Sequence, residues 1–197
     1  MGKKLTKETE HPERIIFLDF DGVLSTDLHD LKFIDSKMNL LDKIIKQTDA
    51  YIVLSTAHRR YKKSLRKFDE AVKKLGWDNN RIVGITPDFK DHICNCIEDH
   101  EIKRTREIKS YITKHKITLW VAIDDITLRL KHFVETNYLK GLNEENVNDI
   151  ISILMRYSKE KTMTQKPHDK ITFKTKPSLI LDTTHKTCKQ RYVDCLT

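Results

Sequence analysis

Short apolar segments that alternate with amphipathic ones constrain the fold of this chain more than any other feature. The first follows Arg14 and reads Ile-Ile-Phe-Leu, a continuous apolar run typical of a strand buried on both faces of a parallel sheet. Three similar segments are predicted to be strands, at residues 51–54, 81–86 and 118–123. Helical spacing of apolar residues predicts helices at residues 36–48, 61–75, 104–115 and 145–157. This alternation predicts an α/β fold with a doubly wound parallel sheet.

The chain is expected to consist of a core domain, residues 1–157, and a basic C-terminal extension, residues 158–197. Its 197 residues suit one domain with a buried core. After Ser158 the apolar periodicity ends, which predicts a linker, followed by two short β-like stretches at 171–174 and 179–181. The extension carries nine Lys or Arg and four Asp or Glu, so most of the formal net charge of +8 lies there.

The polar composition favours a soluble, cytoplasmic protein without a membrane partner. No apolar run reaches the roughly 20 residues of a transmembrane helix, and the polar N-terminus lacks a secretory signal. The four cysteines are too sparse for a disulfide scaffold, which fits a reducing compartment. Four possible metal ligands lie close together in the sequence: His92, Cys94, Cys96 and His100. They lack the paired CxxC spacing of a zinc site, and the sequence does not assign them a role.

Polar side chains follow three of the predicted strands directly. The first strand is followed by Asp19 and Asp21, the second by Ser55 and Thr56, and the fourth by Asp124 and Asp125. Because ligands of parallel α/β sheets bind at the carboxyl ends of the strands, we expect these side chains to share one site. Clustered carboxylates need a cation to offset their repulsion, and their hard oxygen ligands suit Mg²⁺, which also neutralises phosphate.

Four motifs in this order resemble those of the haloacid-dehalogenase-like (HAD) superfamily. They are the DxDG pattern in Leu18–Leu24, Ser55 at a strand end, a basic residue at Lys103 or Arg104, and the acidic pair 124–125. The closer resemblance is to the HAD domain of Swiss-army-knife RNA repair proteins, through Leu18–Leu24, Val53–Arg59 and Arg104–Ile108. This resemblance covers about residues 14–143, and His58 stands where that family commonly has Trp.

The resemblance implies a Mg²⁺-dependent phosphatase. Asp19 would be the nucleophile that forms an aspartyl-phosphate, and Asp21 would act as its acid/base partner. The implied phosphate ligands are Gly22, Ser55, Thr56 and either Lys103 or Arg104. The implied metal ligands are Asp19, the Asp21 carbonyl, Asp124 and Asp125. His58 and Arg59 are possible substrate contacts. The structural alternatives are that Ser55 and Thr56 only cap the following helix, and that Lys103 and Arg104 belong to a solvated basic face.

The gaps between the motifs are too short for the cap domain that usually selects substrates in this superfamily. Asp21 to Ser55 leaves room for a flap and one helix, and Ser55 to Arg104 for a helix, a strand and a loop. An open site favours bulky substrates, so we predict a phosphomonoesterase acting on RNA or DNA ends or on nucleotides. The alternatives are a capless phosphatase for small metabolites or phosphoproteins, and a binding module without turnover. The basic extension would either contact a phosphate backbone or serve solubility.

Overall fold

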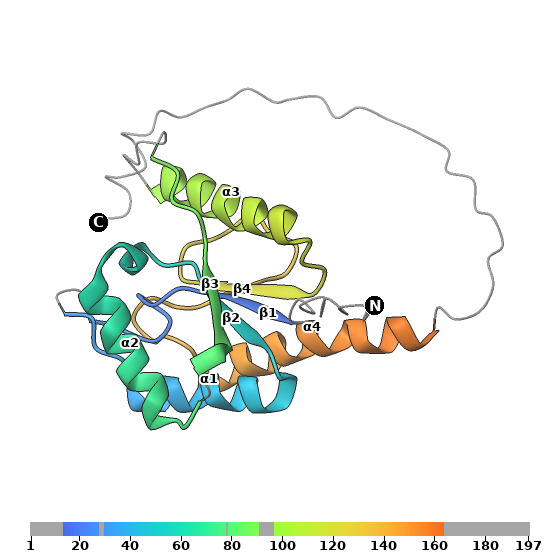
Figure 1. Ribbon diagram of the computed structural model, residues 1–197, viewed down its shortest axis with the longest axis horizontal. Helices are drawn as coiled ribbons and strands as arrows, with labels where there is room; N and C mark the ends of the chain where they lie inside the picture. Colours follow the sequence, from blue (N-terminus) through green and yellow to red (C-terminus); the bar gives the residue numbers. More distant parts are fainter. Residues whose placement is uncertain (1–13, 28–29, 78, 91–96, 164–197) are drawn as a thin grey trace, which may run out of the picture.

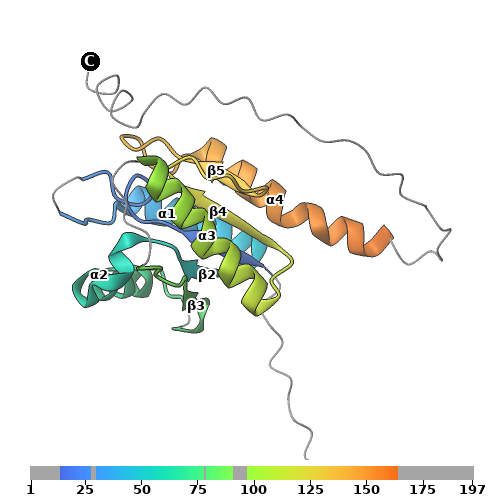
Figure 2. The same cartoon turned by 90° about the horizontal axis from the view of Figure 1, so that it is seen from above.

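Five parallel strands form one sheet in the order β3-β2-β1-β4-β5 (Figures 1 and 2). The computed structural model describes residues 14–27, 30–77, 79–90 and 97–163, without the side chains of residues 157–163. The strands are β1 (Ile15–Leu18), β2 (Tyr51–Leu54), β3 (Ile82–Ile85), β4 (Trp120–Asp124) and β5 (Phe133–Glu135). The predicted parallel α/β fold is confirmed.

Helices cover both faces of this sheet, as a doubly wound fold requires. Figure 1 shows α3 on one face and α1, α2 and α4 on the other. Their bounds are α1 (Asp35–Thr48), α2 (Lys62–Lys74), α3 (Ile97–His115) and α4 (Glu144–Met163), with short 3₁₀ helices η1 (Ala57–Arg60) and η2 (Asn79–Arg81). Within the described residues, no helix is long and apolar enough to cross a membrane.

The central strand β1 is buried on both faces. Ile16 and Leu18 pack into the core under α1, α2 and α4, whereas Ile15 and Phe17 pack into the core under α3. All four side chains are at most 1% exposed. This double burial is the physical reason for the continuous apolar run in the sequence.

Two helix bounds differ from the sequence-based predictions by more than two residues, and one strand was not predicted. Helix α3 begins at Ile97 instead of Arg104, and acidic Glu98 and Asp99 suit its N-terminal turn. Helix α4 ends at Met163, so its backbone continues into the predicted linker. The sequence did not predict β5, since a strand of three residues has too little periodicity to detect.

The β-like stretches 171–174 and 179–181 lie outside the described residues, as do three of the possible zinc ligands, His92, Cys94 and Cys96.

The described part of the chain holds no additional cap domain at either expected insertion point. Between Asp21 and Ser55 the described residues form a loop, α1 and β2. Between Ser55 and Arg104 they form η1, α2, η2, β3 and the first turns of α3. The carboxyl ends of the central strands therefore have no separate domain over them among these residues.

Candidate active site

Asp19, Ser55 and Asp124 lie side by side at the carboxyl ends of β1, β2 and β4. The register pairs Leu18 of β1 with Leu54 and with Ile123, so the residue that follows each of them is adjacent across the sheet. The strand order also reverses here, because β2 lies on one side of β1 and β4 on the other. Such a switch point is where doubly wound sheets bind ligands.

Three carboxylates form a group at this point that could hold a metal ion. Ligand oxygens of Asp19, Asp124 and Asp125 all lie within 4.8 Å of one another. Burial, together with repulsion from Asp19, raises the pKa of Asp125 to about 6. Burial likewise raises the pKa of Asp124 well above its ordinary value, although Arg104 acts in the opposite direction. Crowded carboxylates of this kind favour a bound cation.

The buried guanidinium of Arg104 joins two of these carboxylates. Its Nη1 atom lies 2.6 Å from Asp124 Oδ2 and 3.2 Å from Asp19 Oδ2, and it donates a hydrogen bond to the carbonyl of Ser55. Burial alone would lower the pKa of Arg104, but the carboxylates outweigh it and the pKa is raised. Lys103 instead has its Nζ 3.2 Å from Asp88 Oδ1. Of the two basic residues considered for this position, Arg104 is therefore the one in contact with Asp19.

Asp21 lies farther out than Asp19 and faces His58. The Asp21 side chain is 40% exposed, and its Oδ2 and Oδ1 lie 2.9 Å and 3.2 Å from His58 Nε2. Burial raises the pKa of Asp21, as does Asp19, whereas His58 lowers it. The other ring nitrogen of His58, Nδ1, lies 3.1 Å from Ser64 Oγ. Both nitrogens of this possible substrate contact thus already have protein partners.

A comparison with protein families now identifies the chain. A family model described as the HAD domain in Swiss Army Knife RNA repair proteins matches residues 15–147. The chain belongs to this family. The match confirms the resemblance seen in the motifs, and it places the domain among phosphatase-type hydrolases. A search of curated proteins gives no match.

Two hydroxyls after β2 of the HAD domain have different surroundings. Ser55 Oγ is buried and has no hydrogen-bond partner among the described residues. Thr56 Oγ1 accepts a hydrogen bond from the backbone N–H of His58 at 3.2 Å and so caps η1. Ser55 is therefore free to bind a ligand, whereas Thr56 has the capping role that was the alternative for both.

Gly22 lets the chain turn next to the carboxylate group. Its φ of +62° is a left-handed conformation that side chains disfavour. A Cβ atom at this position would lie 2.5 Å from the Cβ and Cγ of Asp125. Only glycine therefore allows this close approach of the turn to Asp125.

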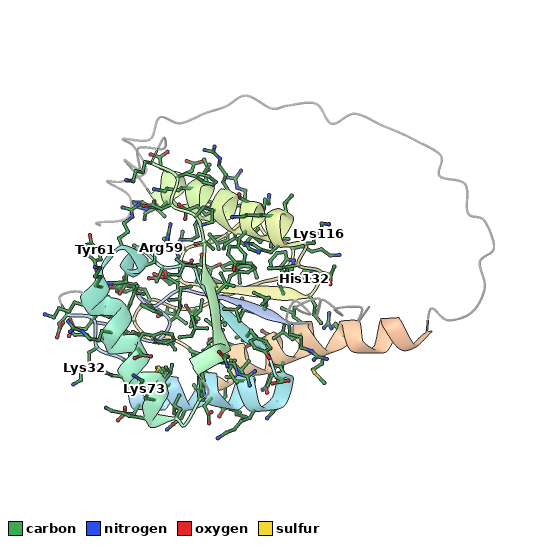
Figure 3. The ribbon with its side chains drawn as sticks, viewed as in Figure 1. Lys32, Arg59, Tyr61, Lys73, Lys116 and His132 are labelled. Carbon is green, nitrogen blue, oxygen red and sulfur yellow. The ribbon has the colours of Figure 1, made fainter. Side chains whose placement is uncertain are left out.

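Arg59 belongs to η1 (Figure 3), and its side chain contacts α3, an environment that differs from the predicted substrate contact. Its Nη2 lies 2.6 Å from Oε2 of Glu107, and the two side chains are 5% and 0% exposed. It also donates hydrogen bonds to the carbonyls of Thr56 and Pro87, at 2.6 Å and 3.2 Å. These contacts favour a structural role, which is to fasten the loops after β2 and β3 to α3.

Sequence reasoning missed two residues that hold the site together. Glu107 pairs with Arg59 and accepts a hydrogen bond from the backbone N–H of Phe89 at 3.2 Å. It belongs to the Arg104–Ile108 motif, so the signal was present in the sequence. Thr136 donates from Oγ1 to the carbonyl of Gly22 at 2.8 Å. It follows β5, which has no clear sequence pattern, so no signal pointed to it.

The buried Arg59–Glu107 pair predicts that replacing Arg59 lowers the stability of the domain much more than replacing its neighbour Arg60. Arg59→Ala would leave Glu107 buried without its partner, and we expect a loss of about 3–5 kcal/mol in the free energy of unfolding. Arg60 is the matched control, because its side chain is 48% exposed and pairs with Asp88 at the surface. Arg60→Ala should change stability by about 1 kcal/mol or less. Urea denaturation measures both, and equal losses would contradict the structural role of Arg59.

The raised pKa of Asp125 predicts a pH-dependent effect of Mg²⁺ on stability. In the metal-free protein this carboxyl, with its folded pKa of about 6, stays protonated to higher pH than in the unfolded chain, whose value is near 3.8, so stability falls as the pH rises between these two values and the loss is complete above about 6. Above that pH the carboxylate is free to bind a cation. Excess Mg²⁺ should therefore raise the thermal unfolding temperature more at about pH 7.5 than at about pH 5.

The control for this measurement is Asp125→Asn, which removes the charge and keeps the size of the side chain. The variant should lose most of the pH dependence of the Mg²⁺ effect. Equal stabilisation by Mg²⁺ at both pH values in the unmodified protein would count against a metal site at Asp19, Asp124 and Asp125.

Proposed function

We propose that this HAD domain is a Mg²⁺-dependent phosphomonoesterase that acts through an aspartyl-phosphate on RNA or DNA ends, or on nucleotides. The observation that carries the proposal is the group of buried Asp19, buried Asp124 and half-buried Asp125, with Arg104 between the first two. A buried charge cluster is weak as a device for stability, because desolvation offsets the attraction. Phosphoryl transfer, in contrast, depends on such positioned charge.

Two carboxylates with different surroundings suit the two chemical steps. In the first, an oxygen of Asp19 bonds to phosphorus while the bond to the leaving oxygen breaks, and Asp21 gives that oxygen a proton. Burial raises the pKa of Asp21, which favours the protonated form that this step needs. In the second step water attacks the aspartyl-phosphate and passes a proton to Asp21. Phosphate leaves, and both carboxyl groups return to their starting states.

The remaining polar groups suit the charge of the transferred phosphoryl group. Ser55 Oγ, buried and without a partner, can donate a hydrogen bond to a phosphoryl oxygen. Arg104 offsets the charge of Asp19 as phosphate approaches. The oxygen donors fit a hard divalent cation, which Asp19, Asp124 and Asp125 would hold with the Asp21 carbonyl. When bound, the cation would neutralise negative charge on the phosphate.

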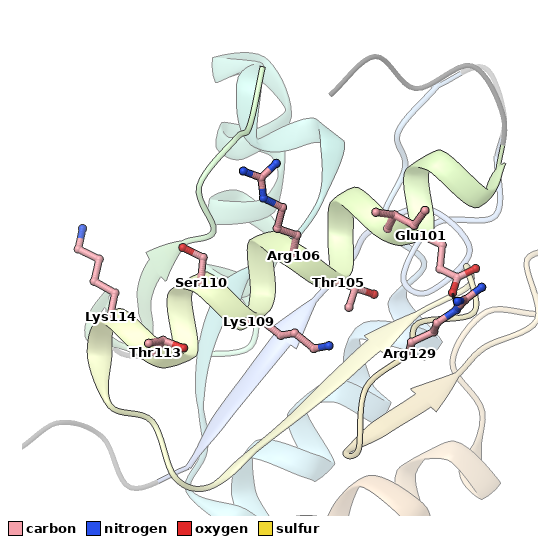
Figure 4. Close-up of a pocket in the computed structure, with 9 residues that line it drawn as sticks. Glu101, Thr105, Arg106, Lys109, Ser110, Thr113, Lys114 and Arg129 are labelled. Atoms are coloured by element: carbon pink, nitrogen blue, oxygen red, sulfur yellow. Dashed lines mark hydrogen bonds and ion pairs between the residues drawn. The ribbon is translucent and has the colours of Figure 1, made fainter. Parts of the chain in front are cut away.

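A basic groove beside the site supports a polyanionic substrate. This α3 groove, of about 710 Å³, runs along the outer side of α3 (Figure 4). Its lining includes four basic residues, Arg106, Lys109, Lys114 and Arg129, besides hydroxyl groups, apolar Ile102 and acidic Glu101, which pairs with Arg129. The groove extends along α3 from Glu101 to Lys114 and includes Thr105, the neighbour of Arg104 in the sequence. From Thr105 to Lys114 a helix extends by roughly 14 Å. If the phosphorylated end of a nucleic-acid strand binds at Asp19, the basic residues of the α3 groove can contact the phosphates that follow in that strand.

The family description also favours RNA as the first substrate to test, since it names RNA repair proteins. The lack of a cap domain among the described residues agrees with a large substrate, because a strand end needs open access to the carboxylates. These two points, with the α3 groove, support nucleic-acid ends over small metabolites.

Phosphate release from a substrate panel tests the proposal. The panel contains RNA and DNA oligonucleotides with 3′- or 5′-phosphates, mononucleotides and nitrophenyl phosphate, each with Mg²⁺ or EDTA. We expect Mg²⁺-dependent release that prefers oligonucleotide ends. Asp19→Asn should abolish turnover, and Asp21→Asn should lower kcat by about 10²–10⁴-fold without unfolding the domain.

The matched control is Asp69→Asn, which changes a surface carboxylate on α2 that is 48% exposed. It should leave every rate unchanged. Activity on nitrophenyl phosphate or mononucleotides alone would indicate a small-molecule phosphatase. A near-normal rate for Asp21→Asn would refute the assigned acid/base role, and no Asp19-dependent release at all would favour a binding module.

The α3 groove makes a separate prediction about substrate length. Lys109→Gln/Lys114→Gln should raise KM for a long phosphorylated oligonucleotide and reduce the salt dependence of binding by about 0.7 per lysine in log–log slope. KM for nitrophenyl phosphate should not change. The control Lys43→Gln/Lys46→Gln removes the same charge from α1, on the other face of the sheet. Equal effects of both double variants would show that only net charge matters.

A further inference from the structure

Resting on the proposed function, we infer that His58 is a positioning residue for Asp21. Ser64 fixes the imidazole of His58, and the imidazole in turn fixes the carboxyl group that exchanges a proton with the substrate. The contacts in the structure carry the inference.

The hydrogen bonds define the direction of this relay. His58 Nε2 lies 2.9 Å and 3.2 Å from the two carboxylate oxygens of Asp21, so with Asp21 ionised and the ring neutral we assign the proton to Nε2, which donates it to the carboxylate. Nδ1 is then the acceptor of the neutral ring, and the Ser64 hydroxyl 3.1 Å away donates to it. The order is thus Ser64 to His58 to Asp21, with each group satisfied by the next.

Two further contacts hold His58 in place, and its partner Ser64 is itself fixed. The ring stacks on Phe20, with centroids 6.3 Å apart and planes inclined by 27°. The backbone N–H of His58 donates to Thr56 Oγ1. Ser64 is itself buried at the start of α2, where its side chain has little freedom. A simple surface ion pair lacks such supports and contributes little.

Asp21 needs a positioning partner because of its place in the chain. It lies three residues beyond the end of β1, and its side chain is 40% exposed, so the sheet does not fix its rotamer. Asp19, in contrast, is buried and contacts Arg104. A general acid must meet the leaving oxygen at hydrogen-bond distance, and small errors in its position lower the rate strongly.

Kinetics with two leaving groups test the inference. The variants are His58→Phe, which keeps a ring beside Phe20, His58→Gln, whose amide nitrogen replaces Nε2 as a donor, and Ser64→Ala. Each is assayed on a phosphorylated oligonucleotide, whose sugar oxygen needs protonation, and on nitrophenyl phosphate, whose anion leaves without it. Circular dichroism and thermal unfolding confirm that each variant is folded.

We expect His58→Phe to lower kcat on the oligonucleotide by about 10- to 100-fold, the effect of losing one hydrogen bond to a charged group, with little change in KM. The loss on nitrophenyl phosphate should be severalfold smaller. His58→Gln should recover most of the rate, and Ser64→Ala should show a smaller loss with the same preference. Equal losses on both substrates, or a Gln variant as slow as Phe, would overturn the inference.

A second measurement separates this inference from the proposed function. If the unmodified domain releases no phosphate from any substrate, the proposed function fails, and ¹⁵N NMR of the imidazole still tests the relay. Protonation at Nε2 in the unmodified domain, with a weaker preference for Nε2 in Ser64→Ala, would support it. A neutral ring protonated at Nδ1 would overturn it.

Discussion

The buried ion pairs of Arg104 are the interaction on which the site depends. One guanidinium joins three strand ends, through Asp19 after β1, the Ser55 carbonyl after β2 and Asp124 at the end of β4. Two buried carboxylates at neighbouring strand ends would repel each other without it, and each would be costly to bury alone. A planar, permanently charged group with several donors suits this position better than the single ammonium of a lysine.

Helix α3 extends this role from the site to the whole sheet edge. Glu107 lies one turn after Arg104 and is also buried, and it binds Arg59 after β2 and the backbone of Phe89 after β3. Through Arg104 and Glu107, α3 therefore contacts the carboxyl ends of β1 to β4 or the segments that follow them. The opposite charge of Glu107 also helps to raise the pKa of Arg104. Packing of the helix and order in the site are thus coupled.

The parts of this arrangement that could be predicted are those with a local pattern. The apolar runs of β1 and β4 predicted buried parallel strands, and the parallel register then placed Asp19 beside Asp124. Strand β5 could not be predicted, because one buried side chain in three residues gives no periodicity. Glu107 lies in a motif that the sequence shows, but its pairing with Arg59 and that of His58 with Asp21 were out of reach, since they depend on how η1 packs against its neighbours, which no local pattern encodes.

The packing of Phe20 explains why Asp19 is buried and Asp21 is partly exposed although only one residue separates them. Phe20 points into the core and packs on Phe33 and Phe68, which turns the chain so that Asp21 emerges while Asp19 stays buried.

Four carboxyl groups of the site, at positions 19, 21, 124 and 125, share one guanidinium, that of Arg104. Burial, together with repulsion between neighbouring carboxylates, favours the protonated forms of three of them, and the pKa values of Asp21, Asp124 and Asp125 are raised. A cation bound by this group would displace protons from Asp124 and Asp125, whereas Asp21, whose side chain is 40% exposed and contacts His58, lies on the solvent side.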